Sequence, residues 1–591
     1  MLYPRNTGTR ETTSLDGLWR LVYDPRHVGL RKGYPRRMPA GTEEVAVPAS
    51  INEQVTGSAK YNHMDWVWYF RKFRAPRSWR GRRVFLRFGS VNYRAEVFLN
   101  GRRLGAHEGG YMPFEFEPGA ALDFDGENFL AVRVDNLLDN CTVPQGDLDP
   151  SIGGVTAWRR DNYPNVHYDF FPFTGIHRPV TLYSTGESRL EKVFLETLRL
   201  AGGAARVRLR GSFSGNAREL RVAIPGLGFE KRFALKGRSG KFEFPLSLKR
   251  VKAWSPRSPK LYEVSFALLD RDGVELDDYA LDFGFRTVKI RGAKILLNGR
   301  EVFLRGFGRH EDTAVSGKGL NLPYLVKDYN LMEWIGANSF RTSHYPYSEE
   351  DMQLADRRGV LVIDESAANT LSMLAARGAD RQKLTATHRG QVTELIERDF
   401  NHPAVIAWSL GNECETYRPE SRGYFRKMVA FARKLDSSQP VTFVVNSSAD
   451  LEREADSFDI ICVNLYPAWY QRCGRLEEVV PLTRERVDGF WKKYRKPILI
   501  SEFGADAVSG LHSEYDLMWS EEFQADMVRQ ICELAEKHPR VCGAHIWNLA
   551  DFKVGQHTGR IILNRKGVFT RDRTPKLVAH TVRKLWRPDG G

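Results

Sequence analysis

From about residue 290 to its end, the chain alternates short apolar runs of strand length with segments of helical periodicity. Apolar residues recur on one helical face in several of these segments, as at Phe523, Met527 and Ile531, which follow a helix start at Ser520. The strand candidates are 302–305, 338–341, 360–363, 405–408, 441–444, 460–463, 498–500 and 544–547. Eight strands that alternate with helices over this length predict a (β/α)8 TIM barrel, whose chemistry lies at the carboxyl ends of the strands.

Two of the predicted barrel strands lead into glutamates. The run 405–408 continues through Gly411 and Asn412 to Glu413, and the run 498–500 is followed by Glu502. Either glutamate alone could be an ordinary strand-end acid in a cap or an ion pair. As a pair ending strands four and seven, both face the same mouth of the barrel, which is what a retaining glycosidase requires.

The first 290 residues indicate β structure instead. Residues 84–88 and 95–99 have strand character, Asn100-Gly101 is a strong hairpin signal, and the aromatic-rich run 66–70 suits a sandwich core. From 186 to 288 the runs 205–210 and 260–266 alternate with period two, which is typical of an immunoglobulin-like sandwich. We therefore expect a β-sandwich over 1–185, an immunoglobulin-like β-sandwich over 186–288 and the barrel over 289–591.

Composition narrows the function classes. A chain of 591 residues is too long for one core, and its six cysteines show no framework spacing, which favours a reduced, cytoplasmic protein. The sequence has no signal-peptide layout and no apolar run long enough for a membrane span. The net charge of +15 is spread along the chain, so it indicates a solvated surface rather than a nucleic-acid site. With no metal-ligand cluster or phosphate-binding glycine loop in view, we expect no cofactor and no metal.

The glutamate segments 408–413 (WSLGNE) and 500–504 (ISEFG) resemble the two signatures of glycoside hydrolase family 2. The order of sandwich, immunoglobulin-like domain and barrel also resembles that family, and implies a jelly-roll, sugar-binding-like first domain. Further segments are similar to the family's β-glucuronidases: 169–178, 340–347, 510–512, 518–523 and 564–573. The resemblance runs over nearly the whole chain. It implies a retaining, exo-acting β-glucuronidase and a homo-oligomer, commonly a tetramer.

The resemblance also implies roles for residues. Glu413 is the general acid and then the general base, and Glu502 is the nucleophile, with carboxyls about 5 Å apart. Asn412 contacts the sugar 2-hydroxyl. For a uronic acid, Asn564 and Lys566 match the family's Asn-x-Lys motif, and such groups bind a carboxylate well.

Arg560 also aligns with a family arginine, although the run 561–563 after it is more apolar than expected. Asp169 reaches the barrel from the first domain to bind a sugar hydroxyl, and Tyr466 hydrogen-bonds Glu502. The remaining expected substrate-binding residues are His344, Asn464, Tyr470 and Trp547, and His310 either lines the same mouth or is structural.

The sequence departs from the family pattern in two places, one near the expected aglycone and one directly after Glu413. The linker 369–388 is short where some relatives carry a long loop over the aglycone, so larger conjugates or oligosaccharide ends are allowed. Cys414 and Glu415 follow the acid glutamate, where the family often has proline. Other readings stay open: a β-galacturonidase, a β-galactosidase or β-mannosidase, or a non-catalytic carbohydrate-binding protein on the same scaffold.

Overall fold

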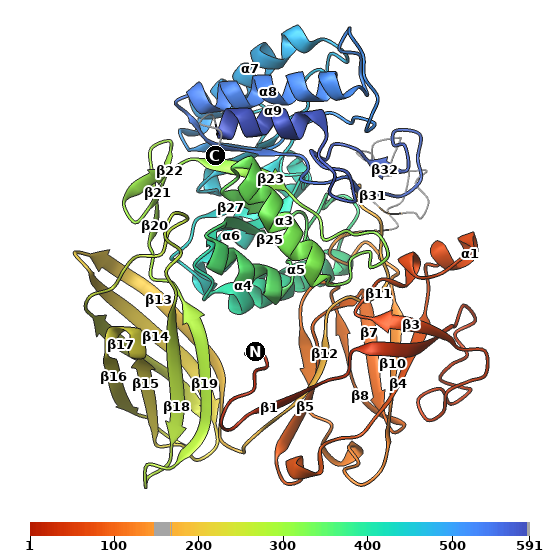
Figure 1. Ribbon diagram of the computed structural model, residues 1–591, viewed down its shortest axis with the longest axis vertical. Helices are drawn as coiled ribbons and strands as arrows, with labels where there is room; N and C mark the ends of the chain where they lie inside the picture. The colour runs from red at the N-terminus through yellow and green to blue at the C-terminus, as the bar shows by residue number, and fades with distance from the viewer. Residues whose placement is uncertain (147–165, 167, 588–591) are drawn as a thin grey trace.

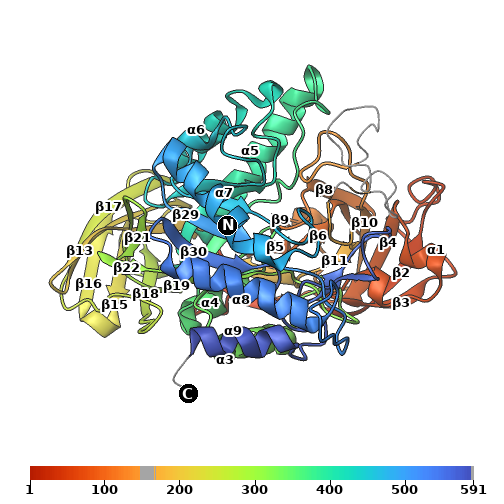
Figure 2. The ribbon, with the colours of Figure 1, turned by 90° about the horizontal axis from the view of Figure 1, so that it is seen from above.

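The computed structural model describes residues 1–146, 166 and 168–587. Two β-sandwiches lie side by side beneath a barrel (Figures 1 and 2), and the N-terminal arm runs between them. The first sandwich packs a six-stranded sheet, in the order β3-β2-β4-β10-β7-β8, against a four-stranded sheet, β1-β12-β5-β9. Its strands are β1 Glu11–Ser14, β2 Gly17–Tyr23, β3 Glu43–Val47, β4 Val67–Phe73, β5 Arg83–Phe88, β7 Arg94–Leu99, β8 Arg102–Glu108, β9 Phe114–Phe116, β10 Asn128–Asp135 and β12 Val180–Thr185; β6 Val91–Asn92 pairs with β11 Gly175–Ile176, and α1 is Ser58–Tyr61.

The hairpin predicted at Asn100-Gly101 is confirmed. β7 and β8 pair on either side of it, and both turn residues have positive φ, 51° and 83°, as a tight turn between twisted strands requires. The aromatic run in β4 is buried on both faces of its sheet. Tyr69 packs between the two sheets, whereas Trp68 and Phe70 form a separate small cluster on the other face.

The second sandwich has the expected immunoglobulin-like architecture. A three-stranded sheet, β13-β14-β17, packs against a four-stranded sheet, β16-β15-β18-β19, around one apolar core. A three-stranded sheet, β20-β21-β22, then leads into the barrel. The strands are β13 Arg189–Ala201, β14 Ala204–Ser214, β15 Glu219–Ile224, β16 Phe229–Ala234, β17 Gly240–Leu248, β18 Tyr262–Leu269, β19 Glu275–Phe283, β20 Val288–Arg291, β21 Lys294–Leu297 and β22 Arg300–Val302.

Eight parallel strands close into the predicted barrel. They are β23 Leu304–Gly308, β24 Ser339–Arg341, β25 Leu361–Glu365, β26 Val405–Asn412, β27 Val441–Val445, β28 Ile461–Asn464, β29 Ile498–Glu502 and β30 Val541–Ile546. The first begins two residues later than predicted, because Val302 belongs to β22. The short strands β31 Phe552–Lys553 and β32 Leu563–Asn564 pair after the last barrel strand.

The α-helices described after the first barrel strand are α3 Leu322–Ile335, α4 Glu349–Arg358, α5 Ala379–Asp399, α6 Tyr424–Leu435, α7 Val479–Tyr494, α8 Glu521–Lys537 and α9 Leu577–Trp586. The helix predicted after Ser520 is confirmed as α8: the Ser520 hydroxyl accepts a hydrogen bond from the Phe523 amide, and the predicted apolar face is buried. Within the described part of the chain, no helix combines the length and apolar character needed to cross a membrane.

The linker predicted over 369–388 is shorter in the structure. Helix α5 begins at Ala379, so the second half of that range is helical and the connection after β25 covers only 366–378. His388 is buried in this helix, and its Nε2 lies 2.9 Å from the Leu410 carbonyl oxygen. The helix is thus tied directly to the strand that leads to Glu413.

Candidate active site

A cavity of about 420 Å³ opens at the carboxyl ends of the barrel strands. Both predicted glutamates line it, and a segment of the N-terminal sandwich, Asp169 and Phe170, closes one side. The lining is Asp169, Phe170, His310, His344, Asn369, Asn412, Glu413, Asn446, Asn464, Leu465, Tyr466, Tyr470, Gln471, Arg486, Glu502, Trp547 and Arg560. The structure thus places Asp169 of the first domain at the barrel mouth, in the same cavity as the two glutamates.

Glu502 is the last residue of β29, and it is buried. Its Oε1 forms an ion pair with Arg341 Nη2, and its Oε2 accepts a hydrogen bond from the Tyr466 hydroxyl at 2.6 Å. Burial raises the pKa of Glu502, while the positive charge of Arg341 opposes that rise. Both oxygens are thus held by donors that favour a carboxylate.

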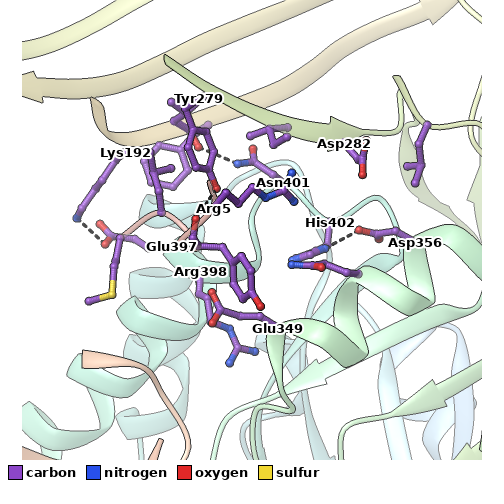
Figure 3. Close-up of a pocket in the computed structure, with 18 of the residues that line it drawn as sticks. Arg5, Lys192, Tyr279, Asp282, Glu349, Asp356, Glu397, Arg398, Asn401 and His402 are labelled. Atoms are coloured by element: carbon purple, nitrogen blue, oxygen red, sulfur yellow. Dashed lines mark hydrogen bonds and ion pairs between the residues drawn. The ribbon is translucent and has the colours of Figure 1, made fainter. Parts of the chain in front are cut away.

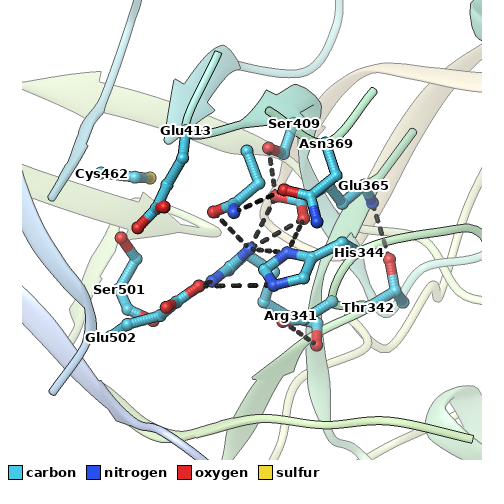
Figure 4. A network of polar contacts seen from close by, with 12 residues as sticks. Arg341, Thr342, His344, Glu365, Asn369, Ser409, Glu413, Cys462, Ser501 and Glu502 are labelled. Atoms are coloured by element: carbon cyan, nitrogen blue, oxygen red, sulfur yellow. Dashed lines mark hydrogen bonds and ion pairs between the residues drawn. The ribbon is translucent and has the colours of Figure 1, made fainter. Parts of the chain in front are cut away.

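Arg341 connects Glu502 to a second buried acid, Glu365. Its Nη1 donates to both Glu365 oxygens, at 2.8 and 2.9 Å, and the Nδ1 of His344 lies 2.9 Å from Glu365 Oε1 (Figure 4). Burial works to raise the pKa of Glu365, but Arg341 and His344 leave it below its usual value. The arginine is therefore clamped between two carboxylates, and its position fixes that of Glu502.

Glu413 stands directly after β26, in a left-handed backbone conformation with φ 48°. Its amide donates to the Val444 carbonyl at 2.8 Å, which holds this strand end against β27. Its side chain is only half-buried, and its Oε1 accepts a hydrogen bond from Asn464 Nδ2 at 2.9 Å. Figure 4 shows Glu413 and Glu502 on the same side of the Arg341 network, and both residues line the cavity.

Asn412 and Asn464 form an amide network beneath Glu413. Asn464 Nδ2 also donates to Asn412 Oδ1 at 3.1 Å, and Asn464 Oδ1 accepts a hydrogen bond from the Ser501 hydroxyl at 2.9 Å. Asn412 Nδ2 donates to Asn369 at 3.0 Å. These contacts fix the orientation of both amides, which line the same cavity as the glutamates.

Two cations and two carboxylates form a cluster on another side of the pocket. Arg560 Nη2 pairs with Asp169 at 2.6 Å and donates to the Tyr470 hydroxyl at 2.7 Å, while its Nη1 lies 3.5 Å from Asp506. Lys566 Nζ pairs with Asp506 and donates to the same Tyr470 hydroxyl at 3.0 Å. Burial works to raise the pKa of Asp506, but Lys566 and Arg560 leave it below its usual value.

Asn564 joins this cluster by donating to Asp169 at 2.9 Å. The structure therefore brings together all three residues predicted for uronate recognition, Arg560, Asn564 and Lys566. Lys566 is also paired with Asp506, a carboxylate that the sequence analysis did not single out. Only Arg560 of the three lines the cavity, and Lys566 lies behind it with a side chain that is fully buried.

Aromatic rings close the floor of the pocket. Trp547 is 4% exposed and stacks on His344 with ring centroids 4.9 Å apart. His310 packs edge-on against Trp547 at 5.4 Å, and its Nδ1 lies 3.1 Å from the Tyr345 hydroxyl oxygen. Burial lowers the pKa of His310 well below its usual value, so it is a neutral, packed histidine that lines the mouth.

Sequence reasoning missed Arg341, Glu365 and Asp506. Arg341 is the last residue of a run that was predicted as a strand, which is the same signal that singled out Glu413. Asp506 lies four residues after Glu502 in a segment without periodicity, and nothing in the sequence connects it to Lys566.

A second cavity, of about 80 Å³, lies where the N-terminal arm meets the immunoglobulin-like sandwich and the outside of the barrel (Figure 3). Lys192 of the immunoglobulin-like sandwich lies 2.6 Å from Glu397 of the barrel, whereas His402 and Asp356, which lie 2.5 Å apart, both belong to the barrel. Neither Glu413 nor Glu502 lines it. Its contacts join domains, and the chemistry belongs to the larger cavity.

Comparison with known protein families matches the chain in three consecutive parts. The model for the sugar binding domain of glycosyl hydrolases family 2 covers residues 12–186, a second family 2 model covers 204–286, and the family 2 TIM barrel domain covers 288–588. The chain belongs to glycosyl hydrolases family 2.

Relatives within the family are similar over their full lengths. The chain is 36% identical to a β-glucuronidase of Paenibacillus borealis, over 99% of this chain and 98% of that one, and 35% identical to the β-glucuronidase of Homo sapiens, over 99% and 92%. Among solved structures it is similar to a β-glucuronidase from Ruminococcus gnavus in complex with D-glucuronic acid. That likeness has a TM-score of 0.91, 33% identity, and 99% of both chains covered.

Proposed function

We propose that this protein is a retaining, exo-acting β-glucuronidase that hydrolyses β-D-glucuronides to D-glucuronate and an alcohol. The observation that carries the proposal is the composition of one cavity. It is lined by the two glutamates at the ends of β26 and β29 and by Arg560, which forms one cluster with Lys566 and Asn564 behind it. The relatives named β-glucuronidase, one of them solved with D-glucuronic acid, support the same sugar.

In the first step, Glu413 gives its proton to the glycosidic oxygen while a Glu502 oxygen attacks the anomeric carbon. The bond to the aglycone breaks, the alcohol leaves, and a covalent glycosyl-enzyme forms. In the second step, Glu413 takes a proton from water, whose oxygen displaces Glu502 with overall retention. Arg341 and Tyr466 support this reaction because both stabilise the departing or attacking carboxylate.

The uronate carboxylate is the feature that distinguishes the substrate. Arg560, Lys566 and Asn564 supply charged and neutral donors for it, and Asp169 accepts from a sugar hydroxyl. Asn412 donates to the 2-hydroxyl, Trp547 offers a flat face to the ring, and Tyr470 places its hydroxyl between the two cations. Charge-assisted hydrogen bonds of this kind contribute about 1.5–3 kcal/mol each.

The test is a panel of aryl glycosides with one leaving group and different sugars. We expect kcat/KM for the β-glucuronide to exceed that for the β-glucoside and β-galactoside by at least about a hundredfold, at roughly 1.4 kcal/mol per tenfold. The β-galacturonide in the same panel measures discrimination at C4. Equal rates on the β-galactoside and the β-glucuronide would overturn the uronate assignment.

We propose three further properties, of which only the assembly rests on the family resemblance. The chain assembles as a homo-oligomer, a tetramer, it works in the cytoplasm, and its domains divide near residues 185 and 289. All six cysteines are free, which suits a reducing compartment. Light scattering at micromolar concentration tests the assembly, and a monomer would contradict it. Limited proteolysis with mass spectrometry tests the boundaries.

A further inference from the structure

Arg486 lies on α7 and lines the same cavity as the two glutamates. It is not part of the uronate cluster, by which we mean Arg560, Asn564 and Lys566 with their partners Asp169 and Asp506. Its guanidinium contacts the loop after β27: Nη1 donates to the carbonyl oxygens of Asn446 at 3.0 Å and Ser447 at 2.5 Å. In the barrel, β27 is next to β26, which carries Glu413. The uronate cluster is built instead from segments after β29 and β30, together with Asp169.

This placement assigns Arg486 to the leaving-group side. The acid Glu413 must lie against the glycosidic oxygen, so the aglycone extends past it. The amide of Glu413 bonds the carbonyl of Val444, which is two residues before Asn446. A short chain of contacts therefore connects the acid to the Arg486 guanidinium.

Arg486 differs from the other cations of the pocket in its pairing. Arg341 is held by Glu365 and Glu502, and Arg560 by Asp169 and Asp506. Arg486 forms no ion pair with any residue that the structure describes, and its Nε and Nη2 donate to none of them. Burial lowers the pKa of Arg486, and only the charge of neighbouring Glu485 opposes this.

The other side chains nearby are polar. Asn446 and Gln471 line the cavity with Arg486, and Asn369 stands behind Asn412. Amides of this kind suit hydroxyl groups of a hydrated aglycone, and a half-buried guanidinium with free donors suits an oxyanion. Leu465 is the apolar exception among the neighbouring lining residues, and it is 7% exposed.

We propose that Arg486 forms an aglycone subsite for an anionic group, a carboxylate or a sulfate, on the leaving-group moiety. The enzyme then prefers glucuronides whose aglycone carries a negative charge, such as an acidic sugar at the next position of an oligosaccharide. This inference rests on the proposed function, since it assigns the leaving group of the same reaction.

The test compares 4-carboxyphenyl with 4-carbamoylphenyl β-D-glucuronide, which share shape and differ in charge. We expect the wild-type enzyme to favour the carboxylate in kcat/KM by about tenfold, which corresponds to roughly 1.4 kcal/mol. Arg486→Gln should abolish that preference while keeping the rate on the carbamoyl substrate. Arg486→Lys should restore part of it. A 4-sulfophenyl glucuronide tells whether the subsite takes a sulfate as well.

Arg484→Gln is the matched control, because it removes the same charge from the same helix at an exposed position that lines a different surface hollow. It should leave the preference unchanged. If it lowers the preference as much as Arg486→Gln does, the effect is one of overall charge and the subsite is refuted.

The outcomes separate this inference from the function beneath it. If the wild type cleaves neither glucuronide, the proposed function fails and the subsite with it. If it cleaves both equally, or if Arg486→Gln keeps the wild-type preference, the subsite alone fails. Arg486→Gln could lose activity on both substrates because it disturbs the loop after β27. In that case the test rests on two other results: the preference of the wild type for the carboxylate substrate, and the smaller preference of Arg486→Lys. A subsite without a positive charge would produce no preference in either protein.

Discussion

The ends of β26 and β29 hold their glutamates in contrasting ways. Glu502 is 4% exposed, and a guanidinium and a phenol bind its two oxygens. Glu413 is half-buried, and of the residues that the structure describes one neutral amide, that of Asn464, donates to its carboxylate. A nucleophile must stay anionic and fixed, whereas an acid–base must exchange a proton twice in each cycle. The contrast between a charged clamp and a neutral donor fits that division of labour.

Replacing the clamped glutamate should have the largest effect. Glu502→Gln keeps the shape and removes the nucleophile, so we expect kcat to fall on the order of 10⁴-fold or more, whichever leaving group is used. Steady-state rates on aryl glucuronides of graded leaving-group acidity measure this. A near-native rate on any of them would remove Glu502 from the nucleophile's role.

Glu413→Gln should cost less and should depend on the leaving group. Loss of general acid catalysis lowers rates by about 10²–10⁴-fold where the alcohol needs protonation. The leaving group of a dinitrophenyl glucuronide needs little protonation, so the rate of the first step on this substrate should be nearly unaffected. Equal losses on good and poor leaving groups would contradict the acid assignment and erase the contrast between the two strand ends.

Lys566 of the uronate cluster resembles Glu502 in that a group of opposite charge, here Asp506, already holds it without substrate. Lys566→Met should lower kcat/KM for the glucuronide by about a hundredfold, or roughly 2.8 kcal/mol, and affect aryl β-galactoside far less. It should also reduce stability, because breaking a buried ion pair costs about 3–5 kcal/mol. Kinetics on both sugars and thermal melts check the two effects.

The double variant Lys566→Met/Asp506→Asn separates recognition from stability. In Lys566→Met, Asp506 loses its nearest cation and keeps Arg560 at 3.5 Å. Asp506→Asn removes this poorly balanced buried charge, so the melting temperature should recover, while the reduced preference for the glucuronide over the galactoside should persist. If Lys566→Met damages both sugars equally, the lysine serves the fold and not the uronate.

Tyr466→Phe should have the smallest effect. It removes the 2.6 Å hydrogen bond to Glu502, and a loss of about tenfold in kcat is expected. That hydrogen bond lowers the pKa of Glu502, so its removal raises the pKa further. Because the nucleophile must be ionised, the acidic limb of the kcat/KM–pH profile should move to higher pH. A limb that stays in place would mean that Tyr466 does not act on the carboxylate.

The sequence was most informative where the signal is local. Strand and helix periods predicted the barrel, and the strand ends at Glu413 and Glu502 predicted its catalytic mouth. Pairing between distant segments has no such signal. The Arg341–Glu365 clamp joins two strands, and the Lys566–Asp506 pair joins two loops, so neither follows from periodicity. The start of α5 at Ala379 was also missed, because its polar first turns resemble a linker.

Asp169 belongs to the N-terminal sandwich, yet it anchors Arg560 of the barrel at 2.6 Å. Both glutamates and the cations of the pocket therefore lie on the barrel, whereas one proposed sugar contact, Asp169, lies on the sandwich. A barrel without the sandwich would retain both glutamates but lose the side of the cavity that Asp169 and Phe170 form. Exchange of the N-terminal sandwich between family members should therefore transfer part of the substrate preference. Because the barrel stays the same, such an exchange leaves both glutamates in place.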